Sequence, residues 1–351
     1  MPMKNRFVDV ARTARVSVAT VSRVATGSAP VSRETEERVN KIARELGVDL
    51  YDRNKSRVIA FLLSNRNMLQ PFHSHVLAGA ESHCSARGWN MLFLSFRYPA
   101  ELSWQHTHLP PILQRRDLVR GFVLAGTNTP NLLEAIGRNR IPFSVLGNNV
   151  VGEWQPEMHD VVWFDDIHGS GEITRYLLSL GHKDIWFVGN IRPPWVARRY
   201  EGYSLAMRDA RLNPRLSDVD SDNDLEVGIL GTKSLLARRE PVSAIFASGD
   251  PTAEGVYKCL RDARLRVPQE ISIVGFGDVG SASLHPPLTT VRVFAEQVGK
   301  RLAELLLNRI ARREIAPQTF VVPTQLIRRE SCQTLAEDAA ADETWRPRIS
   351  V

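Results

Sequence analysis

The sequence predicts a small all-α head followed by a larger α/β core with two parallel sheets, and three observations support this. Residues 7–46 carry apolar side chains at helical spacing and contain no run typical of a strand. From Val58 onward, short apolar runs alternate with amphipathic stretches, which is typical of parallel strands covered by helices on both faces. These runs are numerous enough, over roughly 270 residues, for two sheets of similar size.

Three short helices are expected in the head. Two apolar stripes mark the first two helices: Phe7, Val10, Ala11 and Ala14, followed by Val18, Val21, Val24 and Ala25. The third helix lies in "VSRETEERVNKIARELG", where Ser32 fits the N-cap position and Gly47 follows the last turn. Its inward face is expected to consist of Val39, Ile42, Ala43 and Leu46.

The core shows strand-like and helix-like segments in alternation. The clearest strands are "VIAFLL", "NMLFLSF", "GFVLAG", "FSVLG", "DIWFVG", "AIFAS" and "ISIVGF". Amphipathic helices are expected in "HVLAGAESHCSARG", "GEITRYLLSLG" and "PTAEGVYKCLRDARL". Residues 333–351 are polar and acidic without a clear period, so they are expected to form a flexible tail.

Positive charge is concentrated in the head. Residues 1–58 contain twelve Lys or Arg and seven acids, a surplus of five in a chain whose net charge is +6. A basic head beside a nearly neutral bulk is expected of a nucleic-acid-binding protein. A solvated helical surface without a partner would also fit the charge pattern alone.

The remaining composition indicates a reducing compartment. Cys84, Cys259 and Cys332 lie far apart, which fits free thiols and not a disulfide framework or a zinc site. The N-terminus has no apolar run of signal-peptide length, and no segment approaches about 18 uninterrupted apolar residues. We therefore expect a cytoplasmic chain without a membrane span.

The stretch "VARTA-RVS-VATVSRVATG" fits a helix-turn-helix, in which the second helix presents small or polar side chains to the major groove of DNA. Ser17 is expected to cap the second helix, and Val18, Ala19 and Arg23 to point outward. Arginine reads guanine through two hydrogen bonds, which makes Arg23 the predicted base-reading residue. The expected phosphate-contacting hydroxyls are those of Thr20 and Ser22.

At this point the chain resembles the LacI/GalR family of bacterial transcription regulators. "DVARTARVSVATVSRV" and "VSRETEERV" are similar to the family's headpiece. Further similar segments follow in the family's order up to about Cys332: "VRGFVLAG", "LLSLGHKDIWFVG", "RRYEGYSLAM", "RVPQEISIVGFGD", "PPLTTVR" and "LIRRESC".

This resemblance implies a core like a periplasmic binding protein, with two Rossmann-like subdomains and a small-molecule effector, saccharide-like by default, in the cleft between them. The implied parts are a head with a shortened linker (1–57), a core that binds the effector and dimerises (58–332), and the tail. The first subdomain would comprise residues 58–158 and 293–318, and the second residues 159–292 and 319–332. A homodimer would place two heads on the half-sites of a palindromic double-stranded DNA operator.

Two departures from the family pattern affect the head. The family usually has glycine in the helix-turn-helix turn, where this chain has Arg15, a cation that would lie beside the phosphate backbone or be merely tolerated on the surface. The family's hinge helix, whose leucine wedges into the minor groove, has no counterpart in "VDLYDRNKSRV", unless Leu50 or Tyr51 substitutes for that leucine. We therefore expect little minor-groove insertion and little DNA bending.

The resemblance also implies a set of effector contacts: Phe72, His73, Asn148, Arg199, Asp250 and Asp278. Two polar positions of the family are lost, at Gly249 and Gly277, and Asn148 lies one place past a common contact at Gly147. The segment "YPAELSWQHTHLPPILQ" also departs from the family and adds Trp104, His106 and His108. The effector therefore cannot be copied from the family.

The sequence also contains patterns that suggest a dinucleotide site or a metal site, and neither pattern is complete. "GFGDVG" spells a dinucleotide fingerprint, but Pro286 and Pro287 follow too soon for the helix that such a site needs, so no cofactor is expected. The two H-x-H pairs lack a further ligand at recognisable spacing, so no metal is expected. No catalytic set is present, and an enzyme is not expected. The alternative that stays open is a binding protein or enzyme on this fold without a DNA role.

Overall fold

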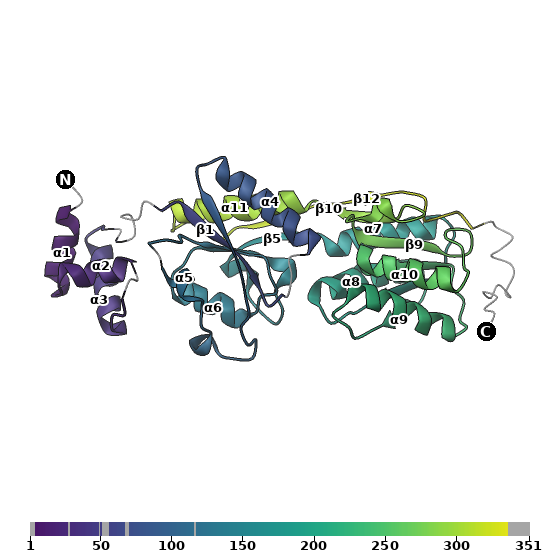
Figure 1. Cartoon of the computed structure of the whole chain (residues 1–351), viewed down its shortest axis with the longest axis horizontal. Helices are drawn as coiled ribbons and strands as arrows, with labels where there is room; N and C mark the ends of the chain where they lie inside the picture. Colours follow the sequence, from purple (N-terminus) through teal and green to yellow (C-terminus); the bar gives the residue numbers. More distant parts are fainter. Residues whose placement is uncertain are drawn as a thin grey trace.

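The computed structural model describes residues 4–26, 29–48, 50, 56–66, 70–115 and 117–335. Figure 1 shows the helical head, coloured purple, followed by two α/β subdomains. No helix in these ranges is long and apolar enough to cross a membrane.

The head contains the three expected helices: α1 (Lys4–Ala14), α2 (Val18–Thr26) and α3 (Arg33–Glu45). Their small core consists of Phe7, Val10, Ala11, Ala14, Val21, Val24, Ala25, Val39, Ala43 and Leu50. Ser32 caps α3 by accepting from the backbone N–H of Thr35, and Gly47 ends it at a φ of 62°. The structure therefore confirms both predicted ends of α3, but Leu46 is exposed and does not belong to the inward face.

The first subdomain is built on an all-parallel sheet in the order β11-β5-β4-β3-β1-β2. Its strands are β1 (Val58–Ser64), β2 (Asn90–Phe96), β3 (Phe122–Leu124), β4 (Phe143–Leu146), β5 (Asp160–Phe164) and β11 (Thr319–Val322). Its helices are α4 (Pro71–Ser85), α5 (Pro111–Gln114), α6 (Pro130–Arg138) and α11 (Ala295–Ala311). Three short 3-10 helices complete it: η1 (Trp104–His106), η2 (Gly147–Asn149) and η3 (Pro156–Met158).

The second subdomain has a sheet in the order β12-β10-β9-β8-β6-β7, parallel except where β12 pairs with β10. Its strands are β6 (Ile185–Gly189), β7 (Arg215–Asp218), β8 (Ala244–Ala247), β9 (Ser272–Gly277), β10 (Thr289–Val293) and β12 (Thr324–Ile327). Its helices are α7 (Asp166–Ser179), α8 (Pro194–Asp209), α9 (Asp224–Ala237), α10 (Asp250–Asp262) and the short η4 (Ser281–Ser283). One apolar cluster continues through both subdomains, from Phe61 of β1 to Phe276 of β9.

The chain crosses between the sheets three times, and two crossings lie later than expected. β5 pairs with β4 and β11, so residues 160–164 belong to the first subdomain and the expected crossing near residue 158 is too early. Likewise β11 pairs with β5, which moves the last crossing from 318 to the residue between β11 and β12. Residues 333–335 pack on the second subdomain, where Leu335 N–H donates to Leu180 O, and residues 336–351 of the expected tail lie outside the described residues.

Arginine occupies the left-handed position at several helix C-termini where glycine is usual. Arg15, Arg140, Arg211 and Arg264 follow α1, α6, α8 and α10 at φ values of 53° to 60°. In each case the next residue is Val, Ile or Leu, whose N–H closes a hydrogen bond back to the helix (Val16, Ile141, Leu212 and Leu265). The positive charge also complements the negative end of the helix dipole. Arg15 therefore follows a rule used throughout this chain, and its presence in the turn is explained without DNA.

The segment containing Trp104 and the second H-x-H pair lies away from the junction of the two subdomains. The guanidinium of Arg138 on α6 lies 5.0 Å from the Trp104 ring centroid. His108 lines a cavity of about 350 Å³ together with Arg23 and Glu36 of the head. The segment therefore covers α6 and faces the head, which differs from the expected contribution to the effector cleft.

Candidate functional site

The N-terminal face of α2 is arranged as the helix-turn-helix interpretation predicts. The Ser17 hydroxyl accepts from the backbone N–H of Thr20 at 3.0 Å and caps the helix. Five of the seven predicted DNA-contacting residues are exposed and two are half-buried: Arg15, Ser17, Val18, Ala19 and Arg23, then Thr20 and Ser22. On the opposite face, Val21 and Val24 are buried in the core of the head. The exposed side chains therefore lie away from the core of the head, and Arg23 also borders the cavity against the first subdomain.

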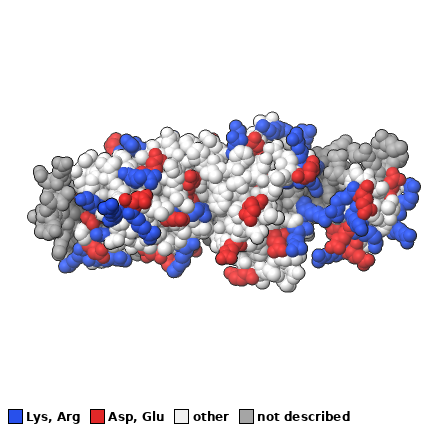
Figure 2. Space-filling model, turned by 180° about the vertical axis from the view of Figure 1, so that it is seen from behind, with Lys and Arg blue, Asp and Glu red and all other residues white. Residues whose placement is uncertain are grey.

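Charge in the head is divided between its helices. Seen from behind in Figure 2, the head carries both basic and acidic side chains. α2 contains no acid, whereas the first turn of α3 contains Glu34 and Glu36. The surface of α2 with Arg15 and Arg23 is thus the part of the head best suited to a polyanion.

The connection from the head to the core is anchored at both ends. Leu50 is 2% exposed and packs in the core of the head. Ser56 donates from its hydroxyl to Leu118 O at 2.6 Å in the first subdomain. Leu50 and Ser56 are six residues apart, so an extended chain spans at most about 20 Å between them. Leu50 is therefore packed in the head and is not exposed as a minor-groove wedge would have to be, and Tyr51 lies outside the described residues.

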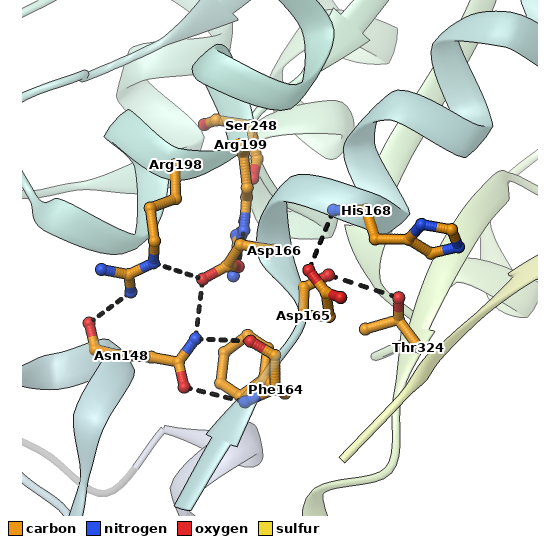
Figure 3. Close-up of polar contacts among 9 residues, drawn as sticks. All are labelled: Asn148, Phe164, Asp165, Asp166, His168, Arg198, Arg199, Ser248 and Thr324. Carbon is orange, nitrogen blue, oxygen red and sulfur yellow. Dashed lines mark hydrogen bonds and ion pairs between the residues drawn. The ribbon is translucent and has the colours of Figure 1, made fainter. Parts of the chain in front are cut away.

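The two subdomains meet at a polar cluster centred on Asp166, the first residue of α7 (Figure 3). Its carboxylate has no solvent exposure and accepts from the Nε atoms of Arg198 and Arg199 at 3.2 and 2.9 Å. It also accepts from the Asn148 amide at 2.8 Å. Asn148 belongs to the first subdomain and the two arginines belong to α8 of the second, so Asp166 connects the subdomains.

Asn148 is engaged entirely by the protein. Its amide donates to Phe164 O and accepts from Phe164 N–H, at 2.8 and 3.0 Å. Its backbone carbonyl accepts from Arg198 at 2.9 Å. The side chain is fully buried. Asn148 therefore holds the chain crossing after β5 in place.

Arg199 lies where the resemblance expects an anchor. Beyond Asp166, it donates to Ser248 O at 2.8 Å, and its guanidinium lies 4.1 Å from the centroid of the Phe276 ring. These partners come from the ends of β8 and β9, so Arg199 joins three elements of the second subdomain.

The aromatic pair predicted after β1 lies at the start of α4. The Phe72 ring contacts those of His73 and Phe164, with centroids 5.2 and 5.5 Å apart. His73 is buried, which lowers its pKa to about 3, so the ring is neutral near pH 7. Phe72 therefore places the predicted aromatic pair next to Phe164, the last residue of β5.

The two predicted acids are both largely buried and accept hydrogen bonds from the protein. Asp250 accepts from Thr290 Oγ1 at 2.6 Å and from Val279 N–H at 2.7 Å, and burial raises its pKa to about 6. Asp278 accepts from Arg292, Arg329 and Ser281 and is 7% exposed. Hydrogen bonds from Ser281 and the two arginines hold the pKa of Asp278 below its usual range despite its burial. Asp278 is therefore part of an ion-pair network within the second subdomain.

Sequence reasoning missed four residues of this region: Arg66, Asp166, Trp195 and Arg198. Ligands of parallel α/β sheets bind beyond the carboxyl ends of the strands. Arg66 and Asp166 both lie a short way past such an end, after β1 and β5. Inspecting the residues after each predicted strand would have found Arg66, but β5 itself was not predicted, so Asp166 had no strand to follow.

Groups for other chemistry are not assembled in the described ranges. No three His, Cys, Asp or Glu side chains there come together in a way that could hold a metal ion. "GFGDVG" continues into the three-residue η4, with Gly277, Asp278 and Gly280 all at positive φ. No helix N-terminus of the length needed for a pyrophosphate follows this motif.

Comparisons with known proteins agree with the architecture. Residues 7–49 match the model of bacterial regulatory proteins, lacI family, and residues 174–332 match the periplasmic binding protein-like domain. The ribose operon repressor of Haemophilus influenzae is 30% identical over 338 residues, which cover 93% of this chain and 98% of that protein.

Two solved structures extend the comparison. The transcriptional regulator CelR in complex with cellobiose has a TM-score of 0.67 at 26% identity, covering 92% of this chain and 98% of that one. A LacI family regulator from Enterococcus faecium with bound ribose has a TM-score of 0.67 at 26% identity, covering 80% of this chain and 100% of that one. With its head, its two-sheet core and a relative similar over nearly its whole length, the chain belongs to the LacI family of bacterial regulatory proteins.

Proposed function

We propose that this protein represses transcription by binding a palindromic DNA operator as a homodimer, and that a sugar-like molecule between its subdomains changes its DNA affinity. The observation that carries the proposal is a solvent-facing α2 surface, without acids, on a head joined to a two-subdomain core. Relatives named as a ribose operon repressor and solved with cellobiose or ribose support a saccharide-like effector. A chromosomal operator places the activity in the bacterial cytoplasm and requires no catalytic step.

The proposed coupling follows from linkage. The Asp166 cluster joins Asn148 of the first subdomain to Arg198 of the second, so a change in subdomain orientation must rearrange these bonds. An effector that prefers one orientation shifts DNA affinity by its difference in binding free energy between the two. Phe72, His73, Arg199 and Asp250 are the proposed effector contacts, and Asn148 and Asp278 support them through the protein contacts described above.

DNA binding is tested by fluorescence anisotropy with a palindrome selected from a randomised duplex library. We expect binding to weaken by about three orders of magnitude or more between 50 and 200 mM salt, because phosphate contacts release counterions. Arg23→Ala is expected to cost about 1–3 kcal/mol of binding free energy through its loss of base contacts. Arg266→Gln, which removes an exposed cation of the second subdomain, is the control. Equal affinity of Arg23→Ala and wild type would contradict the proposed reading surface.

Little DNA bending is expected in that complex. Leu50 is buried in the head, so the wedge that kinks DNA in the minor groove has no candidate among the described residues of the linker. Circular-permutation gel shifts with the selected operator measure the bend. Mobility should vary little with the position of the operator, and a sharp central kink would contradict the expectation.

A further inference from the structure

Arg66 is a basic residue at the junction of the subdomains, and the proposed function assigns it no role. It follows β1 in the first subdomain, yet its guanidinium lies 4.9 Å from the ring centroid of Trp195 on α8 of the second. Its Nη1 donates to the Gln70 side chain at 3.2 Å. Its Nε is shielded from solvent and has no hydrogen-bond partner within the described ranges.

The other shielded arginines of the core show what Arg66 lacks. Arg198 and Arg199 share Asp166, Arg309 pairs with Asp160, and Arg329 pairs with Asp278. Burying a guanidinium is costly unless it is paired, and these pairs follow that rule. Among the described residues Arg66 has no carboxylate within ion-pair distance, and residues 67–69 are Asn, Met and Leu, which bring no negative charge.

Asp224, at the start of α9, is the acid whose charge acts on Arg66. It lies beyond ion-pair distance, and burial raises the pKa of Asp224. Because Asp224 does not reach the Arg66 guanidinium, Arg66 has no paired counter-ion among the described residues.

His73 is a second buried polar side chain nearby. The Asn149 amide nitrogen donates to Ala125 O at 2.9 Å and lies 3.2 Å from His73 Nε2. His73 Nδ1 is shielded and has no partner within the described part of the chain. A neutral imidazole carries its proton on one of its two nitrogens, so Nδ1 donates or accepts according to the tautomer. Burial, and after it the charge of Arg66, lowers the pKa of His73.

We infer that the effector carries an oxyanion, a carboxylate or a phosphate, that accepts a hydrogen bond from Arg66 Nε–H. A shielded cation without a paired counter-ion is matched by a group with several acceptor oxygens and negative charge. Trp195 and Phe72 provide aromatic surfaces beside it. This inference rests on the proposed function and narrows its effector from a sugar to a sugar acid, a sugar phosphate or a metabolite of the same anionic class.

The first test measures the thermal unfolding of the full chain with inorganic phosphate against sodium chloride at equal ionic strength. Phosphate should raise the midpoint in excess of chloride, because a ligand that binds the folded chain stabilises it by mass action. Arg66→Gln should weaken the apparent phosphate affinity by about tenfold or more. Arg66→Lys, which keeps the charge, should retain part of the response. No stabilisation by phosphate, or an Arg66→Gln response equal to wild type, would overturn the inference.

The controls separate this site from nonspecific anion binding and from the proposed function. Arg266→Gln, at an exposed arginine of the second subdomain, should respond to phosphate as wild type does. D-ribose 5-phosphate should bind wild type about tenfold more tightly than D-ribose, and Arg66→Gln should remove that difference. Ribose binding that is equal in both proteins, without a phosphate response, would identify a neutral-sugar site and refute the oxyanion. DNA binding of the same samples is measured separately, and its absence would contradict the proposed function alone.

Discussion

Asp166→Ala is expected to lower the free energy of unfolding by about 3–5 kcal/mol, the typical cost of removing one partner from a buried ion pair. The Asp166 side chain has no solvent exposure, whereas those of Arg198 and Arg199 are 23% and 13% exposed. Without the carboxylate, both guanidinium groups lose their counter-ion, and Asn148 loses an acceptor in the same cluster. Chemical denaturation followed by circular dichroism measures the change.

A matched exposed pair provides the control for this prediction. Arg266 and Glu270 form an ion pair on the surface, with the Arg266 side chain 73% exposed. Glu270→Ala should cost less than about 1 kcal/mol, because solvent screens such pairs and supplies replacement hydrogen bonds. Similar losses in Asp166→Ala and Glu270→Ala would show that the Asp166 cluster contributes no more than a surface pair. Asp166→Asn, which keeps the shape, should lie nearer to Asp166→Ala than to wild type.

Local patterns in the sequence predict the head almost completely, because its determinants are local. Ser17 and Ser32 are N-caps where predicted, and Gly47 ends α3. The apolar stripes correctly predict the buried face of α2, with Val21 and Val24 in the core of the head. Each of these features depends on residues within about one helical turn of one another.

The core was less predictable because strands that cross between subdomains are defined by their partners. β5 and β11 pair with each other across nearly half of the chain, and "DVVWF" carries no turn signal that assigns it to a sheet. The crossings near 158 and 318 were therefore placed too early. Such a boundary depends on which distant strands pair with each other. The local pattern of apolar residues carries no information about that pairing.

The candidate effector residues illustrate the same division. Of the effector contacts that the resemblance implies, Arg199 contacts Asp166 and Phe276 near the junction of the subdomains. The sequence did not show that Asp278 is engaged in ion pairs. Its partners Arg292 and Arg329 come from β10 and from the segment after β12. Such long-range pairs determine which acids are engaged by other protein groups and which are free to contact a ligand.

Arg15 shows that a departure from a family pattern has to be judged against the whole chain. Taken alone, an arginine at a turn glycine suggests a contact with DNA phosphate. The Arg-Ile or Arg-Leu pairs at residues 140, 211 and 264 adopt the same left-handed conformation in the core. Arg15 is therefore one instance of a helix ending that recurs in the core of this chain.

Gly202→Ala is expected to destabilise the chain by about 1–3 kcal/mol, although alanine favours a helix interior over glycine by about 1 kcal/mol. A Cβ at Gly202 would lie 2.2 Å from Ile167 O, because α7 and α8 touch through their backbones there. The two helices must separate to admit it, which draws Arg198 and Arg199 away from Asp166. Chemical denaturation should show a lower free energy of unfolding. The effect of the effector on DNA affinity should also become smaller.

The matched control is Gly137→Ala in α6, where a Cβ would meet nothing within 4 Å. There the same substitution should raise stability by about 0.5–1 kcal/mol, since only the helix preference acts. The opposite signs distinguish a packing requirement from a general intolerance of glycine replacement, and a stabilised Gly202→Ala would refute the close approach of α7 and α8. Because Gly202 belongs to the "RRYEGY" segment, its role also explains the motif physically: the glycine brings α8 close enough for Arg198 and Arg199 to reach Asp166.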